Sequence, residues 1–513
     1  MARRGPGFVC TACGRPATTW VGRCAGCGAW GTVEEAGTGS DPSDDDTDGP
    51  GDAPDGTTTS SGAGPLGPLD GLSLRPWQVD AFAAWATAGC RGVVEAITGA
   101  GKTRLAMAAV RVVVDRGGVA LVLVPTLELL AQWVDELRAH APTARVGRLG
   151  GGNADDFGAH DVLVATPASA SDVPVVPAEG QLGLLVADEA HRYGAPTWSR
   201  ALRDDYAMRL ALTATYERAD DGVVDVLGPY FGPVVSDYGY ARAAADGVIA
   251  PFAIALVGTR LDDHEQATWD TADRAARRAR RVLLSEHGLP RHPRDTLRAA
   301  VEVMGEADSG ARRRDDPVVA VARDWLVQLR ARRDAAAQAA GKLTVAAAVA
   351  PTLHERKTLV FCDTVDQAEQ VATVMRAAGP LAETIHGGLS SERRRIRMAQ
   401  FRNGNLPVVV APRVLDEGVD VPDADVAIVL AAFRSRRQMV QRLGRVLRRT
   451  PDDRVARLLI VHAVGTHEDP SKGAHEEFLD EVLPVAVRVD EVDADEPGAV
   501  ESWMALPLDA SSP

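Results

Sequence analysis

The feature of this 513-residue chain that most constrains its fold is a glycine-rich segment directly after a short apolar run. Residues 92–97 read as a strand, the next six are Thr98-Gly-Ala-Gly-Lys-Thr103, and an alanine-rich, helix-like stretch follows. Such a loop between strand and helix is typical of a P-loop, whose backbone N–H groups and helix N-terminus bind phosphates. The strict pattern begins with glycine, whereas Ala96 stands there in this chain. The predicted binding residues are Thr98, Gly99, Ala100, Gly101, Lys102 and Thr103.

Alternating apolar runs and helix-like segments predict the architecture around this loop. Strand-like runs lie at 92–97, 119–124, 161–165, 184–187 and 209–212, and again at 358–362, 406–411, 426–430 and 456–461. Residues 262–350, between the two sets, are rich in alanine and arginine and helix-like throughout. Because such alternation is typical of βαβ units, the expected fold class is α/β: two parallel-sheet lobes with a helical insertion.

A second chemical signal is the apolar run 184–187, which ends in Asp188-Glu-Ala-His191. Carboxylates at the carboxyl end of a parallel strand face the crevice in which such sheets bind ligands. With the P-loop, this predicts a nucleoside triphosphate site for ATP and Mg²⁺, with Lys102 on the β- and γ-phosphates and Thr103 and Asp188 on Mg²⁺. Glu189 is expected to orient and deprotonate the attacking water. The alternative is a solvated acidic pair at a strand end.

The second lobe carries a basic segment, Gln441-Arg-Leu-Gly-Arg-Val-Leu-Arg448. Arginines spaced by three lie on adjoining faces of a helix. A basic helix is usually a solvated face, but arginines from a second lobe can also stabilise the transition-state charge at the γ-phosphate. Arg445 and Arg448 are the predicted arginine fingers, and Gln441 is expected to sense the nucleotide.

Four of the six cysteines form two CxxC pairs near the N-terminus: Cys10, Cys13, Cys24 and Cys27. Four thiolates at this spacing predict a closed tetrahedral Zn²⁺ site. So small a segment cannot fold on its own apolar core, so that zinc would supply the stabilising free energy. Disulfides or a redox CxxC are the competing interpretation.

The net charge of −15 is concentrated in two segments. Residues 36–71 carry −8 and residues 466–513 carry −11, which leaves +4 for the rest. We interpret both as solvated spacers, with internal mimicry of nucleic acid as the alternative. No apolar run is long enough to cross a membrane and the N-terminus lacks a secretory signal, so a cytoplasmic protein is expected.

These motifs together resemble those of superfamily-2 helicases of the DEAD/DEAH class, over roughly 380 residues. Besides the P-loop and the Asp188–His191 segment, the resemblance rests on ordered segments in both lobes. They begin with Leu74-Arg-Pro-Trp-Gln78, continue through Val124-Pro-Thr126, Ala165-Thr-Pro167 and Leu212-Thr-Ala-Thr215, and end with Leu359-Val-Phe-Cys362, Val414–Pro422 and Gln441–Arg448.

The resemblance implies two RecA-like lobes and roles for further residues. Gln78 would contact adenine, Asp420 would face the ATP cleft, and Thr126 and Thr166 would touch the nucleic-acid backbone. His191, Thr213 and Thr215 would couple hydrolysis to strand binding.

Within that superfamily the chain is most similar to XPB-like helicases of the archaeal type, through residues 212–218 and 413–424. The helical insertion resembles that family's thumb, which grips DNA. The family's Arg-Glu-Asp motif, implicated in opening duplex, is Arg218-Ala-Asp220 here, so that translocation is a safer expectation than strand separation. The cysteine segment resembles the N-terminal zinc ribbon of RadA recombination proteins.

We therefore expect six parts: a zinc ribbon (1–35), an acidic linker (36–70), the ATP-binding lobe (71–255), a thumb-like insertion (256–350), the second lobe (351–465) and an acidic tail (466–513). The expected function is that of an ATP-dependent DNA helicase or translocase in repair, recombination or defence against foreign DNA. Single-stranded or forked DNA is the expected partner, with a nuclease or repair protein as another. The alternatives are an RNA helicase, and an ATP-dependent clamp or restriction-type motor subunit that recruits a partner through the ribbon.

Overall fold

The computed structural model describes residues 72–218, 220–412, 424–430 and 454–508, together with three short strands near the N-terminus. Those strands, β1 (Phe8–Cys10), β2 (Pro16–Ala17) and β3 (Val33–Glu35), form an antiparallel sheet with β1 in the middle. Cys10 is the only predicted zinc ligand in a described strand; Cys13, Cys24 and Cys27 lie outside the described residues.

The first lobe is built on an eight-stranded sheet in which each neighbouring pair is parallel except β6 and β7. In spatial order the strands are β11 (Val234–Tyr238), β4 (Arg91–Ala96), β10 (Met208–Thr213), β9 (Gly183–Asp188), β5 (Val119–Leu123), β8 (Val162–Ala165), β6 (Val146–Gly150) and β7 (Asn153–Ala154).

Helices cover both faces of this sheet, because side chains of its buried strands alternate between two apolar cores. Leu184 and Val186 of β9 join one core, whereas Leu185 and Ala187 join the other. The first core includes α1 (Pro76–Thr87), α2 (Lys102–Val114) and α3 (Leu127–His140); the second includes α4 (Pro167–Asp172), η1 (Ala190–Gly194), η2 (Ser199–Ala201), η3 (Val223–Leu227) and α5 (Gly228–Phe231).

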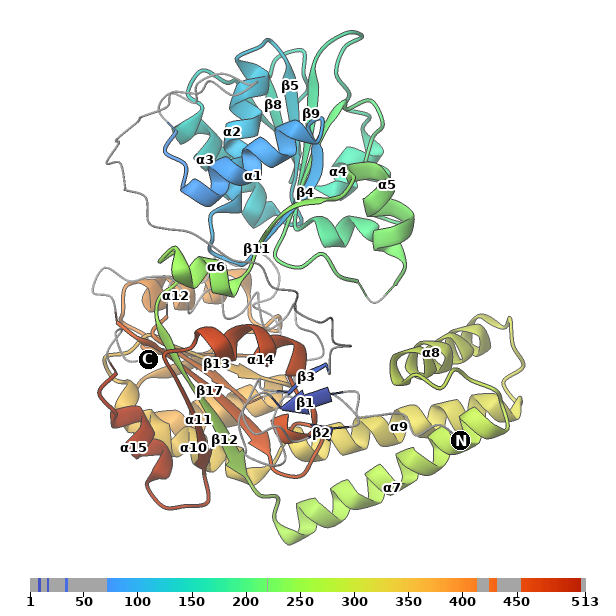
Figure 1. The fold of residues 1–513 in the computed structure, drawn as a ribbon, viewed down its shortest axis with the longest axis vertical. Helices are drawn as coiled ribbons and strands as arrows, with labels where there is room; N and C mark the ends of the chain where they lie inside the picture. Colours follow the sequence, from blue (N-terminus) through green and yellow to red (C-terminus); the bar gives the residue numbers. More distant parts are fainter. Residues whose placement is uncertain are drawn as a thin grey trace, which may run out of the picture.

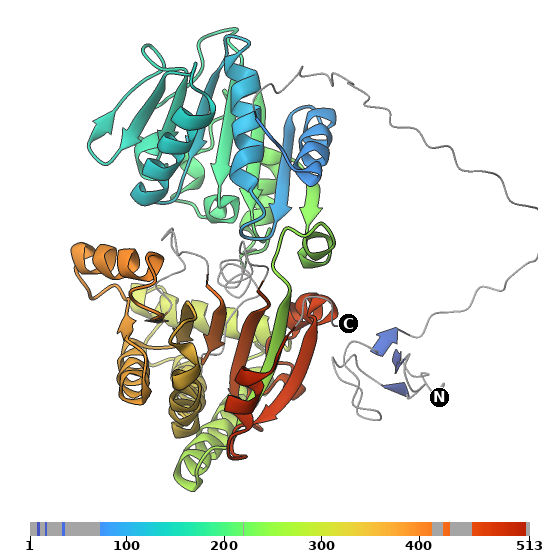
Figure 2. The same cartoon turned by 90° about the vertical axis from the view of Figure 1, so that its left-hand side faces the viewer.

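The second lobe is built on a seven-stranded sheet, parallel throughout. Its strands in spatial order are β14 (Ala382–Thr384), β15 (Val408–Pro412), β13 (Thr358–Cys362), β16 (Val426–Val429), β17 (Ala456–Ala463), β12 (Phe252–Thr259) and β18 (Arg488–Asp493). The helical elements around it are α10 (Ala340–Val349), η4 (Ala350–Leu353), α11 (Val365–Ala378), α12 (Ser391–Arg402), η6 (Pro470–Lys472), α14 (Glu476–Val482), η7 (Leu483–Val485) and α15 (Ala499–Ala505). Figures 1 and 2 show the two sheets in separate halves, with α6 (Tyr240–Ala245) between them.

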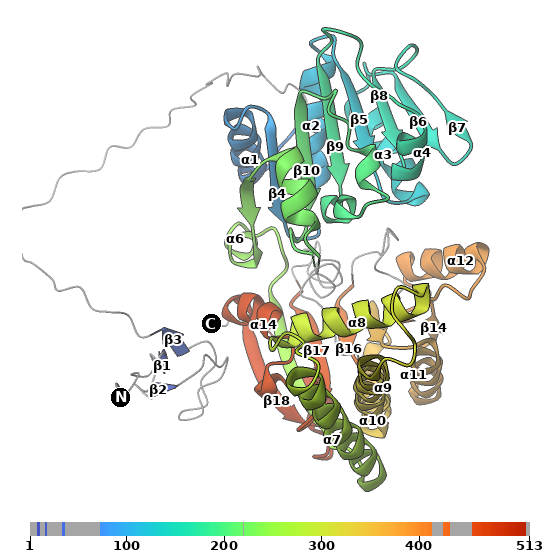
Figure 3. The ribbon, with the colours of Figure 1, turned by 90° about the vertical axis from the view of Figure 1, so that its right-hand side faces the viewer.

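The expected helical insertion is confirmed as three long helices that leave the second lobe: α7 (Asp263–Ser285), α8 (Pro293–Ser309) and α9 (Pro317–Ala337) (Figures 1 and 3). A capping box at Asp262 and Glu265 starts α7. Alanines of α7 pack against Val319 and Trp325 of α9 in one apolar cluster. Arg332 of α9 donates to Asp273 near the middle of α7 over 2.8 Å, which ties the two helices together.

Two predicted boundaries are wrong. The division at 255/256 falls inside β12, which is a strand of the second sheet between β17 and β18. No strand was predicted at residues 252–259, so the boundary fell within a segment that the fold gives to the second sheet.

The expected acidic tail is also wrong for residues 466–508, which fold onto the second lobe. Strand β18 pairs with β12, and Phe478 and Trp503 are buried. Strand β18 lies at a sheet edge, where Arg260 binds its Asp493 and also Asp495 just beyond the strand. No helix in the described part of the chain is both long and apolar enough to cross a bilayer.

Candidate active site

The P-loop lies where the sequence predicts it, between β4 and α2. Gly99 and Gly101 have φ of 86° and 98°, a left-handed conformation that residues with a side chain rarely adopt. A Cβ on Gly101 would also lie 2.7 Å from the side-chain nitrogen of Gln78. Glycine is therefore required at position 101 by both conformation and space.

Lys102 begins α2 and turns its ammonium group back over the loop. Its Nζ donates to the carbonyls of Ala96 (2.6 Å) and Ile97 (3.2 Å). Burial lowers the pKa of Lys102, while the negative charges of Glu189 and Asp188 act in the opposite direction. The cation thus lies among acceptors that a phosphate oxygen could replace.

A further observation supports nucleotide binding at this loop. The Thr98 hydroxyl is buried and has no hydrogen-bond partner among the described residues, which is costly unless a ligand supplies one. Gln78 is 1% exposed and donates to the carbonyl of Gly101 over 2.9 Å, while its amide oxygen accepts from the Arg75 N–H. The residue predicted to contact adenine therefore lies against the P-loop backbone.

Asp188 and Glu189 stand at the carboxyl end of β9. Burial raises the pKa of Asp188, opposed by a hydrogen bond from Trp133 and by the charge of Lys102. Glu189 has a φ of 50°, unusual for a residue with a side chain, so the chain turns sharply after Asp188. Thr103, Asp188 and Glu189 are partly or fully buried around one edge of the sheet, which suits oxygen ligands of Mg²⁺ and a general base.

The predicted coupling residues form a connected chain of hydrogen bonds. His191 Nδ1 lies 3.0 Å from the Thr213 hydroxyl, which donates to the carbonyl of Thr215 over 2.7 Å. Arg218 donates to the carbonyl of His191 and forms a two-point ion pair with Asp220. That hydrogen bonding lowers the pKa of Asp220. The structure thus links the Asp188–His191 segment to Arg218 and Asp220; Ala219 lies outside the described residues.

Thr126 and Thr166 both act as helix N-caps at the carboxyl ends of β5 and β8. Thr126 accepts from the N–H of Leu129 (3.3 Å) and Thr166 from that of Ser169 (3.4 Å). Their predicted contacts with nucleic acid remain predictions. Asp420, Gln441, Arg445 and Arg448 lie outside the described residues, so the predicted arginine fingers stay predictions as well.

Sequence reasoning missed Trp133. Its indole N–H donates to Asp188 Oδ2 over 2.9 Å, and the pair is buried. The tryptophan lies 55 residues before the carboxylate, in the middle of an amphipathic helix, so no spacing rule connects them. It reads as an ordinary core residue, and only the fold brings it to the site.

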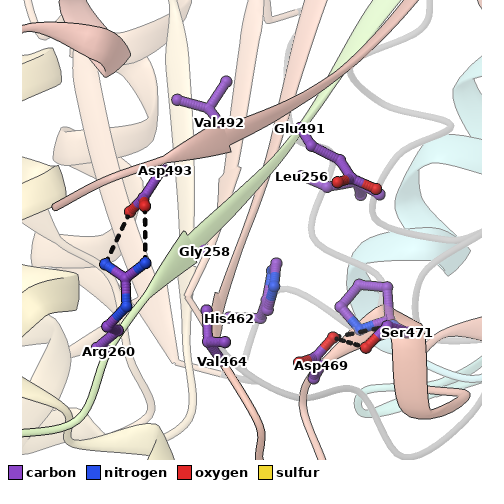
Figure 4. Close-up of a pocket in the computed structure, with 11 residues that line it drawn as sticks. Leu256, Gly258, Arg260, His462, Val464, Asp469, Ser471, Glu491, Val492 and Asp493 are labelled. Carbon is purple, nitrogen blue, oxygen red and sulfur yellow. Dashed lines mark hydrogen bonds and ion pairs between the residues drawn. The ribbon is translucent and has the colours of Figure 1, made fainter. Parts of the chain in front are cut away.

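A cavity of about 390 Å³ in the second lobe is separate from these residues (Figure 4). It lies at the carboxyl ends of β12, β17 and β18, and its described lining contains none of the residues predicted for catalysis. The Asp469 and Asp493 carboxylates there are bound within the chain, by Ser471 and Arg260 respectively (Figure 4).

Comparison with protein families gives three matches along the chain. Residues 71–218 match the type III restriction enzyme res subunit, residues 342–450 the helicase conserved C-terminal domain, and residues 8–35 the rubredoxin metal binding domain. The first match corresponds to the first lobe, the second to the second lobe and the third to the cysteine segment.

Individual relatives extend over most of the chain. It is 28% identical to the DNA 3'-5' translocase XPB2 of Sulfurisphaera tokodaii, over 77% of this chain and 83% of that protein. It is also 28% identical to a putative DNA 3'-5' helicase Rad25 of Haloarcula marismortui, over 78% of this chain but only 54% of that protein. This chain thus spans about half the length of the Rad25 relative.

Among solved structures, the Hef helicase domain of Pyrococcus furiosus superposes with a TM-score of 0.52. The match covers 77% of this chain and 96% of that one at 18% identity, which shows a shared fold of two RecA-like lobes. With the P-loop, the Asp188–Glu189 pair and both helicase family matches in place, the chain belongs to the superfamily-2 helicases, is XPB/Rad25-like, and carries an N-terminal rubredoxin-type metal-binding ribbon.

Proposed function

We propose that this protein couples ATP hydrolysis to movement along DNA. The observation that carries the proposal is the pair of hydrogen bonds that His191 makes beside the phosphate site. Its ring bonds the Thr213 hydroxyl, and its carbonyl accepts from Arg218, so that both coupling segments are tied to the Asp188–His191 segment. The names of the relatives, a DNA 3'-5' translocase and a DNA 3'-5' helicase, support DNA as the substrate.

Each residue of the site has a definite task in this proposal. Lys102 exchanges its two carbonyl acceptors for oxygens of the β- and γ-phosphates, and Thr103 and Asp188 hold Mg²⁺. Bound Mg²⁺ would neutralise charge that develops on the phosphates. Glu189 accepts a proton from the attacking water. Arg445 and Arg448, with Gln441, are assigned to complete the site from the second lobe, which would make hydrolysis depend on lobe closure.

Translocation is proposed ahead of strand separation. Arg218 and Asp220 bind each other in a two-point ion pair, so their charges are already compensated within the chain. Ala219 between them offers no carboxylate, unlike the Glu of the family motif. An Ala219→Glu variant that unwinds forked DNA faster than the wild type would show that this position limits strand opening.

The ribbon is proposed to hold Zn²⁺ through Cys10, Cys13, Cys24 and Cys27 and to bind DNA or a partner such as a nuclease or repair protein. The rubredoxin-type match over residues 8–35 supports a metal there. Reduced protein purified without chelator should contain one zinc per chain, and a zinc content near zero would reject the site.

One experiment tests the central proposal. ATP hydrolysis is measured with single-stranded, duplex and forked DNA and with RNA, for the wild type and Glu189→Gln. We expect stimulation by DNA over RNA, and for Glu189→Gln retained ATP binding with hydrolysis reduced by about 100-fold or more. Glu179→Gln is the matched control, because Glu179 is exposed in the same lobe. Stimulation by RNA alone would favour an RNA helicase, and ATP binding without stimulated hydrolysis would favour a clamp.

A further inference from the structure

Trp133 stands out as a buried side chain with a polar contact in the phosphate site. It is 1% exposed, and its indole N–H donates to Asp188 Oδ2 over 2.9 Å. We propose that Trp133 is a positioning residue: it holds the Asp188 carboxylate in the orientation that binds Mg²⁺ and ties it to helix α3. This inference rests on the proposed use of Mg²⁺–ATP at Asp188.

The two oxygens of Asp188 are each fixed by one donor. Oδ2 accepts from Trp133, and Oδ1 accepts from the backbone N–H of Glu189 over 3.0 Å. Each carboxylate oxygen has a second lone pair, so these bonds set the plane of the group and leave a lone pair on each oxygen for a metal or its water. Without the Trp133 bond, rotation about Cβ–Cγ would be restrained at one oxygen only, by the Glu189 N–H.

An indole is well suited to this task because it only donates. It stays a donor at every pH at which the protein is folded, and it competes with Mg²⁺ neither as a ligand nor as a charge. Partners that orient a ligating carboxylate in this way change metal affinity without touching the metal.

The position of Trp133 on α3 also connects Asp188 to Thr126, which is predicted to touch the nucleic-acid backbone. Helix α3 starts at the Thr126 cap, and Trp133 is its seventh residue, roughly 9 Å along the axis at 1.5 Å per residue. Trp133 shares one apolar core with Leu105 of α2 and Val186 of β9, so the indole is held by packing. A shift of the Thr126 loop would therefore move the indole and the carboxylate together.

The alternative is that the bond only satisfies a buried N–H. Trp85 provides a matched comparison, since it is 0% exposed in the same lobe and donates to the carbonyl of Arg209, also over 2.9 Å. Both tryptophans pack in the same apolar core, but only Trp133 contacts a predicted Mg²⁺ ligand.

The test measures Mg²⁺-dependent binding of N-methylanthraniloyl-ADP by the full chain, from the anisotropy of the directly excited label. For Trp133→Phe we expect the Mg²⁺ concentration at half-maximal binding to rise roughly tenfold. Trp85→Phe should lower the melting temperature and leave that concentration unchanged. An unchanged Mg²⁺ midpoint in Trp133→Phe, or an equal rise in Trp85→Phe, would overturn the proposal.

A measurement on the unaltered protein covers the case in which Trp133→Phe does not fold. The chain has nine tryptophans, and their indole N–H signals can be followed by nuclear magnetic resonance. Adding Mg²⁺ to the ADP complex should shift one of them, and Mn²⁺ should broaden that same signal. The proposal fails if Mg²⁺ shifts none of the nine. Wild-type protein that binds no ADP at all would instead reject the proposed function itself.

Discussion

Each lobe places a lysine beside its sheet, and the two lysines differ in what surrounds them. Lys102 in the first lobe is half-buried and is held by two backbone carbonyls, with Asp188 and Glu189 nearby. Lys342 in the second lobe is 1% exposed and binds the equally buried Glu468 at 2.6 Å.

The difference distinguishes a lysine that can bind a ligand from one that is sealed. Lys342 also donates to the carbonyl of Leu430 over 2.8 Å, so it joins α10 to the end of β16 and to the segment after β17. Its charge is balanced within the chain, whereas the acceptors of Lys102 are neutral and replaceable. The more deeply buried of the two lysines is therefore not the one predicted to bind phosphate.

The largest expected effect is on the chemistry of the first lobe. Lys102→Ala should reduce ATP hydrolysis by about 100-fold or more, because one preorganised cation at the phosphates is lost. Its free energy of unfolding should stay within about 1 kcal/mol of the wild type, since only two exchangeable hydrogen bonds disappear. Hydrolysis assays and denaturant titration check both; a large loss of stability would remove the distinction between the two lysines.

Lys342→Ala should show the reverse pattern. It leaves Glu468 as an uncompensated buried charge, a change that costs about 3–5 kcal/mol of unfolding free energy. Replacing both partners, Lys342→Met with Glu468→Leu, should restore most of that loss. Denaturant titration of the three variants measures this, and a double variant no better than the single one would contradict a sealed pair.

Lowering the pH should destabilise the second lobe through buried histidines near the Lys342–Glu468 pair. Burial lowers the pKa of His467 to about 4, and both its ring nitrogens are buried without a hydrogen-bond partner among the described residues. The unfolded chain, with an ordinary pKa of about 6.5, then binds more protons between pH 6.5 and 4. Stability should therefore fall as the pH falls through that window.

His467→Gln should flatten this fall in thermal melts recorded from pH 7 to 4. Exposed His264→Gln is the matched control and should leave the slope unchanged. His475, whose pKa is also lowered to about 4 by burial, should account for part of the remaining slope.

The smallest expected effect is the loss of stability when one helix cap is removed from each lobe. Thr126→Ala and Thr364→Ala each remove a threonine cap, from α3 and α11 respectively, and each should cost about 1 kcal/mol. Only Thr126→Ala should also weaken stimulation of hydrolysis by DNA, because only Thr126 is assigned to the nucleic-acid backbone. Equal stimulation of the two variants would limit Thr126 to a capping role.

The sequence predicted the buried parallel strands of the two sheets better than the strands at their edges, with the buried strand β12 as the exception. All nine predicted strands form, because a fully buried parallel strand is a continuous apolar run. The strands that were not predicted are β6, β7, β11, β12, β14 and β18. All of them except β12 are short, half-exposed, or at or next to a sheet edge, whereas β12 is fully buried. Residues 466–508 were predicted to be a tail because charge was counted over the whole segment, and β18, with only two valines among polar residues, gives no clear strand pattern.

The same limits apply to the site. That Lys102, Asp188 and Glu189 lie together was predictable, because a glycine-rich loop and a strand end in one parallel sheet meet at the same side of it. Trp133 was not, because its contact depends on how α3 packs against the sheet. The hydrogen bond between His191 and Thr213 likewise spans 22 residues, and the sequence supplied only its two ends.

The assignment of β12 to the second sheet makes the connection between the lobes very simple. In the described part of the chain, every strand of the first sheet precedes residue 239 and every strand of the second follows residue 251. The thumb-like helices lie between β12 and β13, so they belong to the second half. The polypeptide could therefore be divided near Gly247 into two separately produced halves, each with a complete sheet, whereas a cut at residue 256 would split β12, an inner strand of the second sheet.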